Sequence, residues 1–578
     1  MDRRIKIIFS LFCIWFIVIS CRLWYMQVLQ QSKYTNLSIK NRTRFVRLQS
    51  GRGKIYDRNG ILLVDNKPAT QLVVTVGEIE DREELAKDLS LITRLSVDYI
   101  VKKIKEYMYK PFIPAVLASD MNAETLINVA EQRWRLPGAS IQVVPVRDYI
   151  LKDTAAHAIG YVGEVGEKDI VSGYIPGDTI GRTGLERKLD SKLRGEPGYK
   201  EIQVDYRGNI DDVLEIVKPR NGDSFFLTID SVLQTELFNA MEGHRGAGVV
   251  IDPDSGEILA IVSSPSFNPN SFVSPVKEDV VKNLFIDKDR PMLDRSLGGL
   301  YPPGSIFKII VALAALEKGL VFEKNTFMCD GEFQLGDAKF RCWEKKGHGR
   351  VDLVDALKKS CNEYFYQVGL KAGRSAISEM AKKFGFGCVT GIEVPGERGG
   401  FIPDDEYISS LDKNKKWSSG DTVNLSIGHG KILITPIQAA CFISAIANGG
   451  ILYKPKIIFG EDPEGKEIDL DKKYIDLVKK GLYRVVNEPD GTGHTVFVEG
   501  LDICGKTGTV ELIEKGRKRD ICWFAGFASI CDSKIAVVIV TEEGVSGGVT
   551  AGPVARKIFS KWKDLQEEAE KREDAEVL

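Results

Sequence analysis

A long apolar run lies near the N-terminus of the chain. Positions Ile7 to Cys21 are all apolar or small, and three basic residues precede them. Continued to Val28, the run has about 22 residues, which is enough for a helix to cross a bilayer. Trp24 and Tyr25 are residue types that anchor such a helix at the membrane interface. The pattern predicts a transmembrane helix over residues 7–28.

Two other interpretations of this run concern its processing. A cleaved signal peptide needs a small-residue A-x-A-like site, and none follows the run. A lipoprotein signal is the second alternative, because Val18-Ile19-Ser20-Cys21 loosely fits a lipobox. A lipid anchor, like a transmembrane helix, leaves the protein membrane-bound. Basic residues stand on both sides of the run, so their count does not fix its orientation.

Residues from about 40 to 215 mix short β-like runs with charged helical stretches. The runs Gln71–Val76 and Ile141–Val146 predict strands, and Glu80–Tyr107 and Asn122–Trp134 predict helices. We find no constellation of catalytic residue types in this region. It is therefore expected to be a structural domain.

Beyond about residue 220 the apolar runs become stronger. Val249–Ile251 and Ile258–Val262 predict a hairpin, because Asp254-Ser255-Gly256 between them are turn residues. Ile521–Ala528 and Lys534–Val540 predict two more strands of the same antiparallel sheet.

Length and charge limit the classes of protein to which the chain can belong. A chain of 578 residues is too long for one domain, so two soluble domains and a tail are expected. With 79 basic and 81 acidic residues the net charge is −2, and we see no basic stripe with interleaved aromatics. These features exclude nucleic acid as the expected partner. Asp564–Leu578 is dense in charge, which predicts a solvated helix end or a disordered tail.

A serine and a lysine stand at the start of a strongly apolar segment. Ser305 follows Pro302-Pro303-Gly304, and Ile306–Leu316 is apolar on every side apart from Lys308. This predicts a buried helix with Ser305 in its first turn and Lys308 one turn later on the same face. A serine hydroxyl needs a base to become a nucleophile, and a buried lysine with a depressed pKa can serve. A surface lysine after a serine would not explain a charge in this segment.

Two further motifs follow in order. Ser360-Cys361-Asn362 lies on Val351–Leu370, which has helical spacing, although Ser-x-Asn alone also fits an ordinary helix cap. Lys506-Thr507-Gly508-Thr509 continues a strand-like stretch that begins at Ile503. Together with Ser305-x-x-Lys308 they form the S-x-x-K, S-x-N, K-T-G signature of penicillin-recognising serine acyltransferases. The motifs are expected on a buried helix, a loop or helix edge, and an edge strand, around one cleft between sheet and helices.

On these motifs the chain resembles the class B penicillin-binding proteins, over about residues 1 to 560. Its similarity to the elongation-type branch, penicillin-binding protein 2, is greater than to the septal branch, because of Gly181–Glu186, Leu193–Gly195 and Tyr206–Gly208. One departure is His429, which stands where the family usually has Gln. The other segments that carry the resemblance are Arg52–Gly60, Gly385–Gly387, Thr390–Ile392, Pro395–Glu397, Gly420–Thr422, Ile427–Gly430 and Thr435-Pro436.

The resemblance implies a membrane-anchored α+β protein in the cell (inner) membrane. It implies a single pass, with the catalytic domain outside the cytoplasm. The expected segments are a cytoplasmic N-terminus (1–6), the transmembrane helix (7–28), an extended, β-rich pedestal or dimerisation domain (40–215), a transpeptidase domain (220–560) and a charged tail (561–578). The transpeptidase domain is expected to resemble serine β-lactamases, with an antiparallel sheet flanked by helices.

The resemblance also implies an activity, peptidoglycan D,D-transpeptidation in cell elongation. Ser305 would attack the D-Ala-D-Ala carbonyl of a stem peptide, and β-lactam antibiotics would acylate the same serine. Lys308 would be the base, and Ser360, Asn362 and Lys506 would relay protons and position groups. The backbone N–H groups of Ser305 and Thr509 would form the oxyanion hole, and Thr507, Gly508 and Thr509 would bind substrate. The implied membrane partner is a RodA-like polytopic glycan polymerase.

Two alternatives to transpeptidation remain open at this point. A D,D-carboxypeptidase or a serine β-lactamase would pass the same acyl-enzyme to water. Class A lactamases carry a glutamate in an E-x-x-L-N loop, but no Glu between residues 363 and 505 is followed four positions later by Asn. A penicillin sensor or inactive scaffold is the other alternative. The three motifs are complete, so they give no reason to expect an inactive protein.

A cluster of soft ligands lies between the first two motifs. Cys329, Cys342, His348 and Cys361 have the spacing C-x12-C-x5-H-x12-C, and three thiolates with one imidazole are a closed structural zinc set. Some elongation-type relatives have a zinc site in this stretch, and the resemblance matches it least securely at Cys329, where Asp330 is the alternative ligand. A Cys329–Cys342 disulfide is a competing interpretation, as is a buried, unligated Cys361. No cofactor is expected for the chemistry itself.

Overall fold

The N-terminal segment is a continuous helix. The structure, a computed structural model, describes residues 3–34, 42–108, 114–119, 121–166, 168–169, 174–175, 178–204, 210–273, 276, 278–410, 417–514 and 517–577. Helix α1 (Arg3–Trp24) passes directly into a π-helical turn, η1 (Tyr25–Leu29). Within Arg4–Leu29 an 18-residue window has a mean hydropathy of 2.2, and this helix is long and apolar enough to cross a membrane. The predicted apolar helix is confirmed. Parts of the predicted segments lie outside the described residues, and so does Tyr206–Gly208, one of the stretches that carry the resemblance.

The chain divides into two compact units, each assembled from separated stretches. Unit 1 comprises Met1–Arg52, Pro68–Pro145 and Arg194–Gly222, and unit 2 comprises Gly53–Lys67, Val146–Leu193 and Asp223–Leu578. The region predicted as one domain, 40–215, therefore contributes to both units. The reason is that strands β3 (Leu62–Thr75) and β5 (Ala139–Tyr149) continue from one unit into the other.

Unit 1 is built on antiparallel strand pairs with short helices. Strands β1 (Thr43–Leu48), β8 (Gly198–Val204) and β9 (Ile210–Val217) form a three-stranded sheet. Strand β4 (Pro114–Ser119) pairs with the Gln71–Thr75 part of β3. The predicted helical stretch 80–107 is two helices, α3 (Arg82–Thr93) and α4 (Val97–Glu106), because Arg94 takes a left-handed conformation with φ 61°. Helix α5 (Ala123–Glu131) begins after the N-cap Asn122, as predicted.

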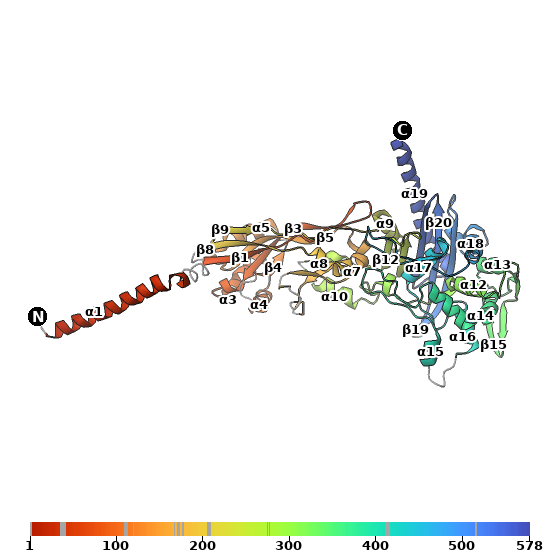
Figure 1. Cartoon of the computed structure of the whole chain (residues 1–578), viewed down its shortest axis with the longest axis horizontal. Helices are drawn as coiled ribbons and strands as arrows, with labels where there is room; N and C mark the ends of the chain where they lie inside the picture. The colour runs from red at the N-terminus through yellow and green to blue at the C-terminus, as the bar shows by residue number, and fades with distance from the viewer. Residues whose placement is uncertain are drawn as a thin grey trace. The chain divides into compact units, whose positions relative to one another are not determined.

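Unit 2 contains a five-stranded antiparallel sheet in the order β12-β11-β21-β20-β19. Its strands are β11 (Gly246–Ile251), β12 (Ile258–Ser264), β19 (Ile503–Glu514), β20 (Arg517–Ile530) and β21 (Ser533–Thr541). The predicted hairpin and the predicted strands of the third motif region are all present in this sheet. Strand β19, which carries the third motif, lies at one edge (Figure 1).

Helices cover both faces of this sheet. On one face, α9 (Ser231–Ala240) and α19 (Gly552–Val577) pack against side chains such as Val250 and Ile539. On the other face, α17 (Pro436–Ala447) and α12 (Lys308–Glu317) share a core with Val249 and Val538. Neighbouring strand residues point to opposite faces, so central strands such as β11 and β21 are apolar on both sides and are buried between helices.

The second motif lies between two helices. The segment Val351–Leu370, which has helical spacing, contains α13 (Leu353–Lys358), which ends before the motif, and α14 (Asn362–Lys383), which begins inside it, so the predicted loop or helix edge is confirmed. Between them Ser360 has φ 51°, a left-handed conformation that a helix interior does not admit. The charged tail is the end of α19 and is helical to Val577.

The other elements connect these parts. The remaining strands are β2 (Ile55–Tyr56), β6 (Val162–Glu164), β7 (Thr179–Gly181), β10 (Phe225–Phe226), β13 (Phe327–Cys329), β14 (Glu332–Leu335), β15 (Ala338–Arg341), β16 (Gly349–Val351), β17 (Ile451–Tyr453) and β18 (Gly465–Glu467). The remaining α-helices are α6 (Ala156–Ile159), α7 (Gly184–Lys188), α8 (Asp190–Leu193), α10 (Glu278–Ile286), α11 (Arg295–Gly298), α15 (Asp405–Ser410), α16 (Ser419–Leu425) and α18 (Lys472–Asn487).

Candidate active site and cysteine–histidine cluster

Ser305 lies in a tight turn that opens the buried helix. It belongs to the 3₁₀ turn η7 (Gly304–Phe307), which leads directly into α12, so its predicted place at the helix start is confirmed. Gly304 has φ 56°, and its N–H donates to the Gly428 carbonyl oxygen over 3.0 Å. A Cβ on Gly428 would come within 2.2 Å of the Gly304 carbonyl oxygen, so both glycines are required for this close approach.

Lys308 connects the first motif to the second. Its side chain is fully buried. The Nζ atom donates to the Ser360 carbonyl oxygen (2.8 Å), to Ser360 Oγ (3.2 Å) and to Asn362 Oδ1 (2.7 Å). All three acceptors are neutral oxygens. The hydrogen bonds from Lys308 to the second motif therefore bring no carboxylate to the lysine.

The left-handed turn at Ser360 makes this arrangement possible. With φ 51°, the residue turns its carbonyl oxygen and its hydroxyl to the same donor, Lys308. The indole Nε1 of Trp343 donates to the same carbonyl oxygen (3.2 Å) and to that of Lys359 (3.0 Å). Asn362 begins α14, whose first turn fixes its side chain toward Lys308.

The third motif passes beside the Ser305 turn. A Cβ on Gly508 would lie 3.1 Å from the Pro303 carbonyl oxygen and 3.5 Å from the Ser305 backbone nitrogen. A Cβ on Gly304 would likewise lie 3.5 Å from the Thr509 backbone nitrogen. The N–H groups of Ser305 and Thr509 thus belong to two adjacent pieces of backbone, as an oxyanion hole requires.

Lys506, the lysine of the third motif, is also fully buried and donates to the Thr507 carbonyl oxygen over 3.0 Å. Burial holds the pKa of Lys506 well below its usual range, and the nearby positive charge of Lys308 lowers it further. Burial likewise lowers the pKa of Lys308 to about 8. A lysine with such a pKa is partly neutral near neutral pH and can accept the proton of a serine.

Three residues that the motifs did not single out as catalytic also lie at this site. Trp343 supports the Ser360 turn, as described above. Thr492 accepts a hydrogen bond from the Thr507 hydroxyl (3.1 Å). Burial, and then Lys308, lower the pKa of His429 to about 4, so its imidazole is neutral at physiological pH. Trp343 and Thr492 belong to none of the three motifs, so the sequence carried no signal for them.

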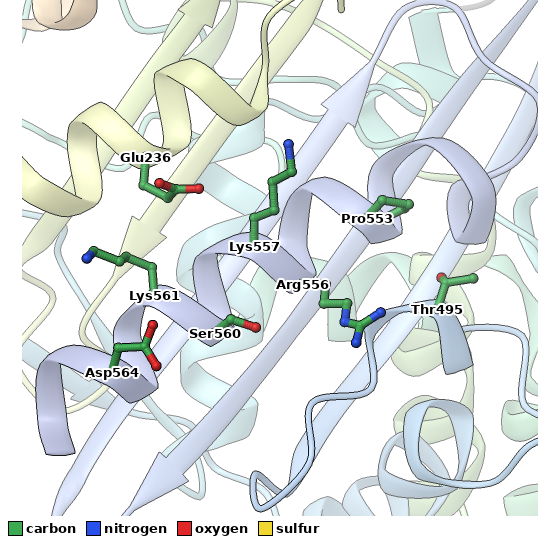
Figure 2. A pocket seen from close by; sticks show the side chains of 8 residues that line it. All are labelled: Glu236, Thr495, Pro553, Arg556, Lys557, Ser560, Lys561 and Asp564. Atoms are coloured by element: carbon green, nitrogen blue, oxygen red, sulfur yellow. The ribbon is translucent and has the colours of Figure 1, made fainter.

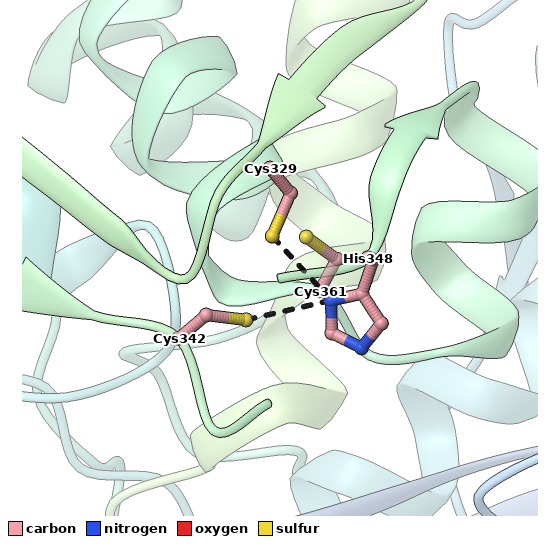
Figure 3. A group of neighbouring side chains, drawn as sticks. All are labelled: Cys329, Cys342, His348 and Cys361. Carbon is pink, nitrogen blue, oxygen red and sulfur yellow. Dashed lines mark hydrogen bonds between the residues drawn. The ribbon is translucent and has the colours of Figure 1, made fainter. Parts of the chain in front are cut away.

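The four predicted zinc ligands come together. Cys329, Cys342, His348 and Cys361 place one ligand atom each within 4.8 Å of one another (Figure 3). The Sγ atoms of Cys329 and Cys342 lie 3.5 Å and 3.6 Å from Nδ1 of His348. The cysteines are buried and free, so the structure contains no Cys329–Cys342 disulfide, and Asp330 is not a member of the group.

A separate surface cavity of about 750 Å³ lies on α9 and α19 (Figure 2). Its side chains are of both charges: Glu236 and Asp564 are acidic, and Arg556, Lys557 and Lys561 are basic. The described residues that line it include none from the three motifs. We therefore place the candidate active site at the motifs and not at this cavity.

Comparison with protein families matches both soluble regions. Residues 246–560 match a family described as the penicillin-binding protein transpeptidase domain. Residues 47–227 match the penicillin-binding protein dimerisation domain. The two matches together cover most of the chain.

Comparison with individual proteins agrees with these family matches. The peptidoglycan D,D-transpeptidase MrdA of Acinetobacter baumannii is 33% identical over 590 residues, covering 97% of this chain and 87% of the relative. A structure of penicillin-binding protein 2 with MreC from Helicobacter pylori matches with a TM-score of 0.80 and 28% identity, covering 90% of this chain and 99% of the other. A structure of a peptidoglycan synthase complex, described as coordinating polymerization and crosslinking, matches with a TM-score of 0.72 and 27% identity. The match covers 96% of this chain and 98% of the other.

Proposed function

Because the chain belongs to the class B penicillin-binding proteins and is a peptidoglycan D,D-transpeptidase, we propose that Ser305 is its nucleophile. Ser305 Oγ attacks the penultimate D-Ala carbonyl carbon of a stem peptide and gives its proton to Lys308. The C–N bond to the terminal D-Ala breaks, and the departing amine takes that proton. An amino group of a neighbouring stem then attacks the serine ester, and its proton returns to Ser305 through the same base.

The observation that carries this assignment is the environment of Lys308. A fully buried amine bonded only to the neutral oxygens of Ser360 and Asn362 is able to cycle between its charged and neutral forms. It lies at the start of the helix that Ser305 opens. Ser360 Oγ accepts from Lys308, and the charge of Lys308 acts on Lys506, so we assign proton relay and positioning to these two residues.

The substrate would lie along strand β19. The N–H groups of Ser305 and Thr509 would stabilise the oxyanion, and Thr507, Gly508 and Thr509 would bind the stem peptide and its carboxylate. The close approach of Gly508 to the Ser305 turn supports this placement, because a side chain there would collide with the Pro303 carbonyl oxygen or Trp523.

Labelling with a fluorescent penicillin tests the nucleophile. The full chain in detergent should give one labelled peptide, which contains Ser305, and Ser305→Ala should abolish the label. Ser255→Ala, a serine in the β11–β12 turn of the same unit, is the matched control and should label normally. Labelling that persists in Ser305→Ala would refute the assignment.

The fate of the acyl-enzyme separates transpeptidase from the hydrolytic alternatives. A transpeptidase should hold benzylpenicillin as a long-lived adduct, because its site does not activate water efficiently. Rapid release of hydrolysed drug would instead indicate a β-lactamase. Release of D-Ala from stem peptides without cross-linking would indicate a carboxypeptidase.

The N-terminal helix makes this a membrane-anchored protein, and we place it in the cell (inner) membrane with the catalytic unit outside. The reason for this placement is that the family's cross-linking substrate lies outside the cytoplasm. Protease added to intact spheroplasts should then digest residues beyond the span. Protection of these residues would contradict the orientation.

The membrane partner that we propose is a RodA-like glycan polymerase, within the machinery of cell elongation. This proposal is supported by the similarity of the chain to the solved peptidoglycan synthase complex, in which polymerization and crosslinking are coordinated. Another similar chain was solved with MreC. The full chain should co-purify with the polymerase and stimulate it, and a variant lacking residues 1–30 should not. Equal stimulation by both would contradict a role for the span.

We also propose that the cysteine–histidine cluster holds a structural zinc ion. In a tetrahedral site with Zn–S of about 2.3 Å and Zn–N of about 2.0–2.1 Å, neighbouring ligand atoms lie about 3.5–3.8 Å apart. The Sγ to Nδ1 distances of 3.5 Å and 3.6 Å fit this geometry. The ion would fix the loop that precedes Ser360 and would take no part in the chemistry.

Elemental analysis tests the zinc proposal. Protein prepared without added metal should contain about one zinc per chain. Cys342→Ser should lose it and melt at a lower temperature, whereas Cys388→Ser, an exposed free cysteine outside the cluster, should keep it. A non-reducing mass map that joins Cys329 to Cys342 in zinc-free protein would refute the proposal.

A further inference from the structure

One carboxylate outside the three motifs lies at the centre of a dense polar network. Glu542 directly follows strand β21, and its Oε1 accepts hydrogen bonds from the Tyr301 hydroxyl (2.9 Å) and from Arg295 Nε (2.8 Å). Its Oε2 lies 2.6 Å from Nε of Arg245. Tyr301 and Arg295 are almost completely buried. The catalytic steps described above do not use any of these groups.

The first arm of the network leads to the nucleophile. Tyr301 is followed by Pro302, Pro303 and Gly304, and then by Ser305. Proline fixes φ, so this short segment transmits a displacement of Tyr301 instead of absorbing it. The indole Nε1 of Trp523 donates to the Pro302 carbonyl oxygen (3.0 Å), and its ring meets the Tyr301 ring edge to face.

The second arm leads to the third motif. The chain continues from Glu542 to Gly547, whose N–H donates to Thr509 Oγ1 over 3.0 Å. A Cβ on Gly547 would lie 2.3 Å from the Trp523 carbonyl oxygen and 2.5 Å from that of Gly508. This segment is therefore packed tightly along the backbone of the third motif.

The charges around Glu542 hold it in place from two sides. Arg295 also donates to the carbonyl oxygens of Asp289 and Arg290. Arg245 also pairs with Asp289 and Glu543. A partly buried carboxylate between two guanidinium groups has little freedom to move. Burial and then Glu542 raise the pKa of the Tyr301 hydroxyl, which therefore remains a donor.

We propose that Glu542 is a positioning residue that, through Tyr301, fixes the Ser305 segment against the third-motif strand and thereby sets the rate of acylation. The proposal rests on Ser305 as the nucleophile. A misplacement of a reacting group by about 1 Å can cost about 100-fold in rate. A looser segment should therefore slow the acylation step more than it weakens binding.

The test separates the acylation rate constant from the binding constant for a fluorescent penicillin, by stopped-flow saturation kinetics on the full chain in detergent. Tyr301→Phe removes one hydroxyl and leaves the ion pairs, and it should lower the acylation rate constant about tenfold with little change in the binding constant. Glu542→Gln should have a similar effect. The double variant should be no slower than the slower single variant, because both changes break the same link.

Glu543→Gln is the matched control. Glu543 is the residue after Glu542, and its side chain is 60% exposed. It also pairs with Arg245, but the Tyr301 hydroxyl donates to Glu542 and not to Glu543. It should acylate at the normal rate. Should Glu542→Gln fail to fold, Tyr301→Phe still decides the question. The proposal would be overturned if Tyr301→Phe kept an acylation rate constant within twofold of that of the unmodified protein, even with a lower melting temperature. It would also be overturned if the effects of Tyr301→Phe and Glu542→Gln multiplied in the double variant. Labelling of Ser305→Ala would instead refute the proposed nucleophile.

Discussion

Two lysines are buried close to the second motif, and their surroundings differ in charge. Lys308 is fully buried and donates to neutral oxygens of Ser360 and Asn362. Lys358, two residues before Ser360, is 5% exposed and donates to Glu488 (2.6 Å) and Asp490 (3.0 Å). Burial lowers the pKa of Lys308 to about 8. Burial would also lower the pKa of Lys358, but the two carboxylates outweigh it, and that pKa is raised.

The difference shows that the charge of the partners, and not burial alone, decides what a buried lysine can do. A carboxylate partner stabilises the ammonium form and makes the lysine a permanent cation. A neutral oxygen accepts a hydrogen bond from either form and leaves the proton free to move. Lys308 is thus suited to act as a base, and Lys358 is suited to hold the end of α13 in place.

The largest effect is expected from removing the base. Lys308→Ala should lower the rate of acylation by a fluorescent penicillin about 100- to 10,000-fold, as loss of a general base does. Lys308→Arg should be equally poor, because a guanidinium does not deprotonate in proteins. Lys318→Ala, at the end of the same helix, is the control and should acylate normally. Normal acylation by Lys308→Arg would show that Lys308 is only an electrostatic group.

The pH dependence of acylation should report the lowered pKa of Lys308. Only the neutral amine accepts a proton, so the rate constant should rise about tenfold per pH unit below pH 8 and level off above it. Stopped-flow measurements between pH 6 and 9, corrected for hydrolysis of the free drug, give the profile. Lys358→Met should keep the same midpoint. A flat profile over this range would mean that another group takes the serine proton.

Local patterns were sufficient to predict one side of the site. A single lysine inside the apolar run after Ser305 predicted a buried charge, and the strand-like stretch at Ile503 predicted an edge strand. Both features depend on residues that are neighbours in sequence. The convergence of the four cysteine and histidine ligands was also suggested by composition, although their spacing is not a standard motif.

Other features depend on contacts between distant parts of the chain, which a single sequence does not reveal. The left-handed conformation of Ser360 was not predicted, because the apolar spacing continues on both sides of it. The link between Tyr301 and Glu542 joins residues that lie 241 positions apart. The two units were not predicted as discontinuous, because β3 and β5 each read as ordinary strands where they pass from one unit to the other.

A smaller effect is expected at Trp343, which supports the oxygen that Lys308 binds. Trp343→Phe keeps a ring but removes the donor to the carbonyl oxygens of Lys359 and Ser360. The net value of one such hydrogen bond is about 1 kcal/mol, so acylation should slow about threefold to fivefold. Trp417→Phe, whose indole bonds to Thr422 instead, is the matched control. An unchanged rate in Trp343→Phe would show that Lys308 alone holds the turn.

The smallest effect on chemistry is expected at Lys358, where the change should appear in stability. Lys358→Met removes two ion pairs, but both carboxylates are partly exposed, so the loss should be about 1 kcal/mol. Arg484, and then Lys358, lower the pKa of Glu488 from its ordinary 4.5 to about 2. A carboxylate with a depressed pKa stabilises the fold above its ordinary pKa and loses this contribution as the pH falls toward 2.

The melting temperature of Lys358→Met should therefore lie a few degrees below that of the unmodified protein at pH 6–7, and the gap should shrink below about pH 4. Acylation at saturating drug should change less than about threefold, because the Lys358 backbone carbonyl still accepts from Thr492. Lys359→Met, the same substitution one residue on, is the control. If Lys358→Met instead abolished acylation without lowering the melting temperature, Lys358 would belong to the chemistry and the contrast with Lys308 would be wrong.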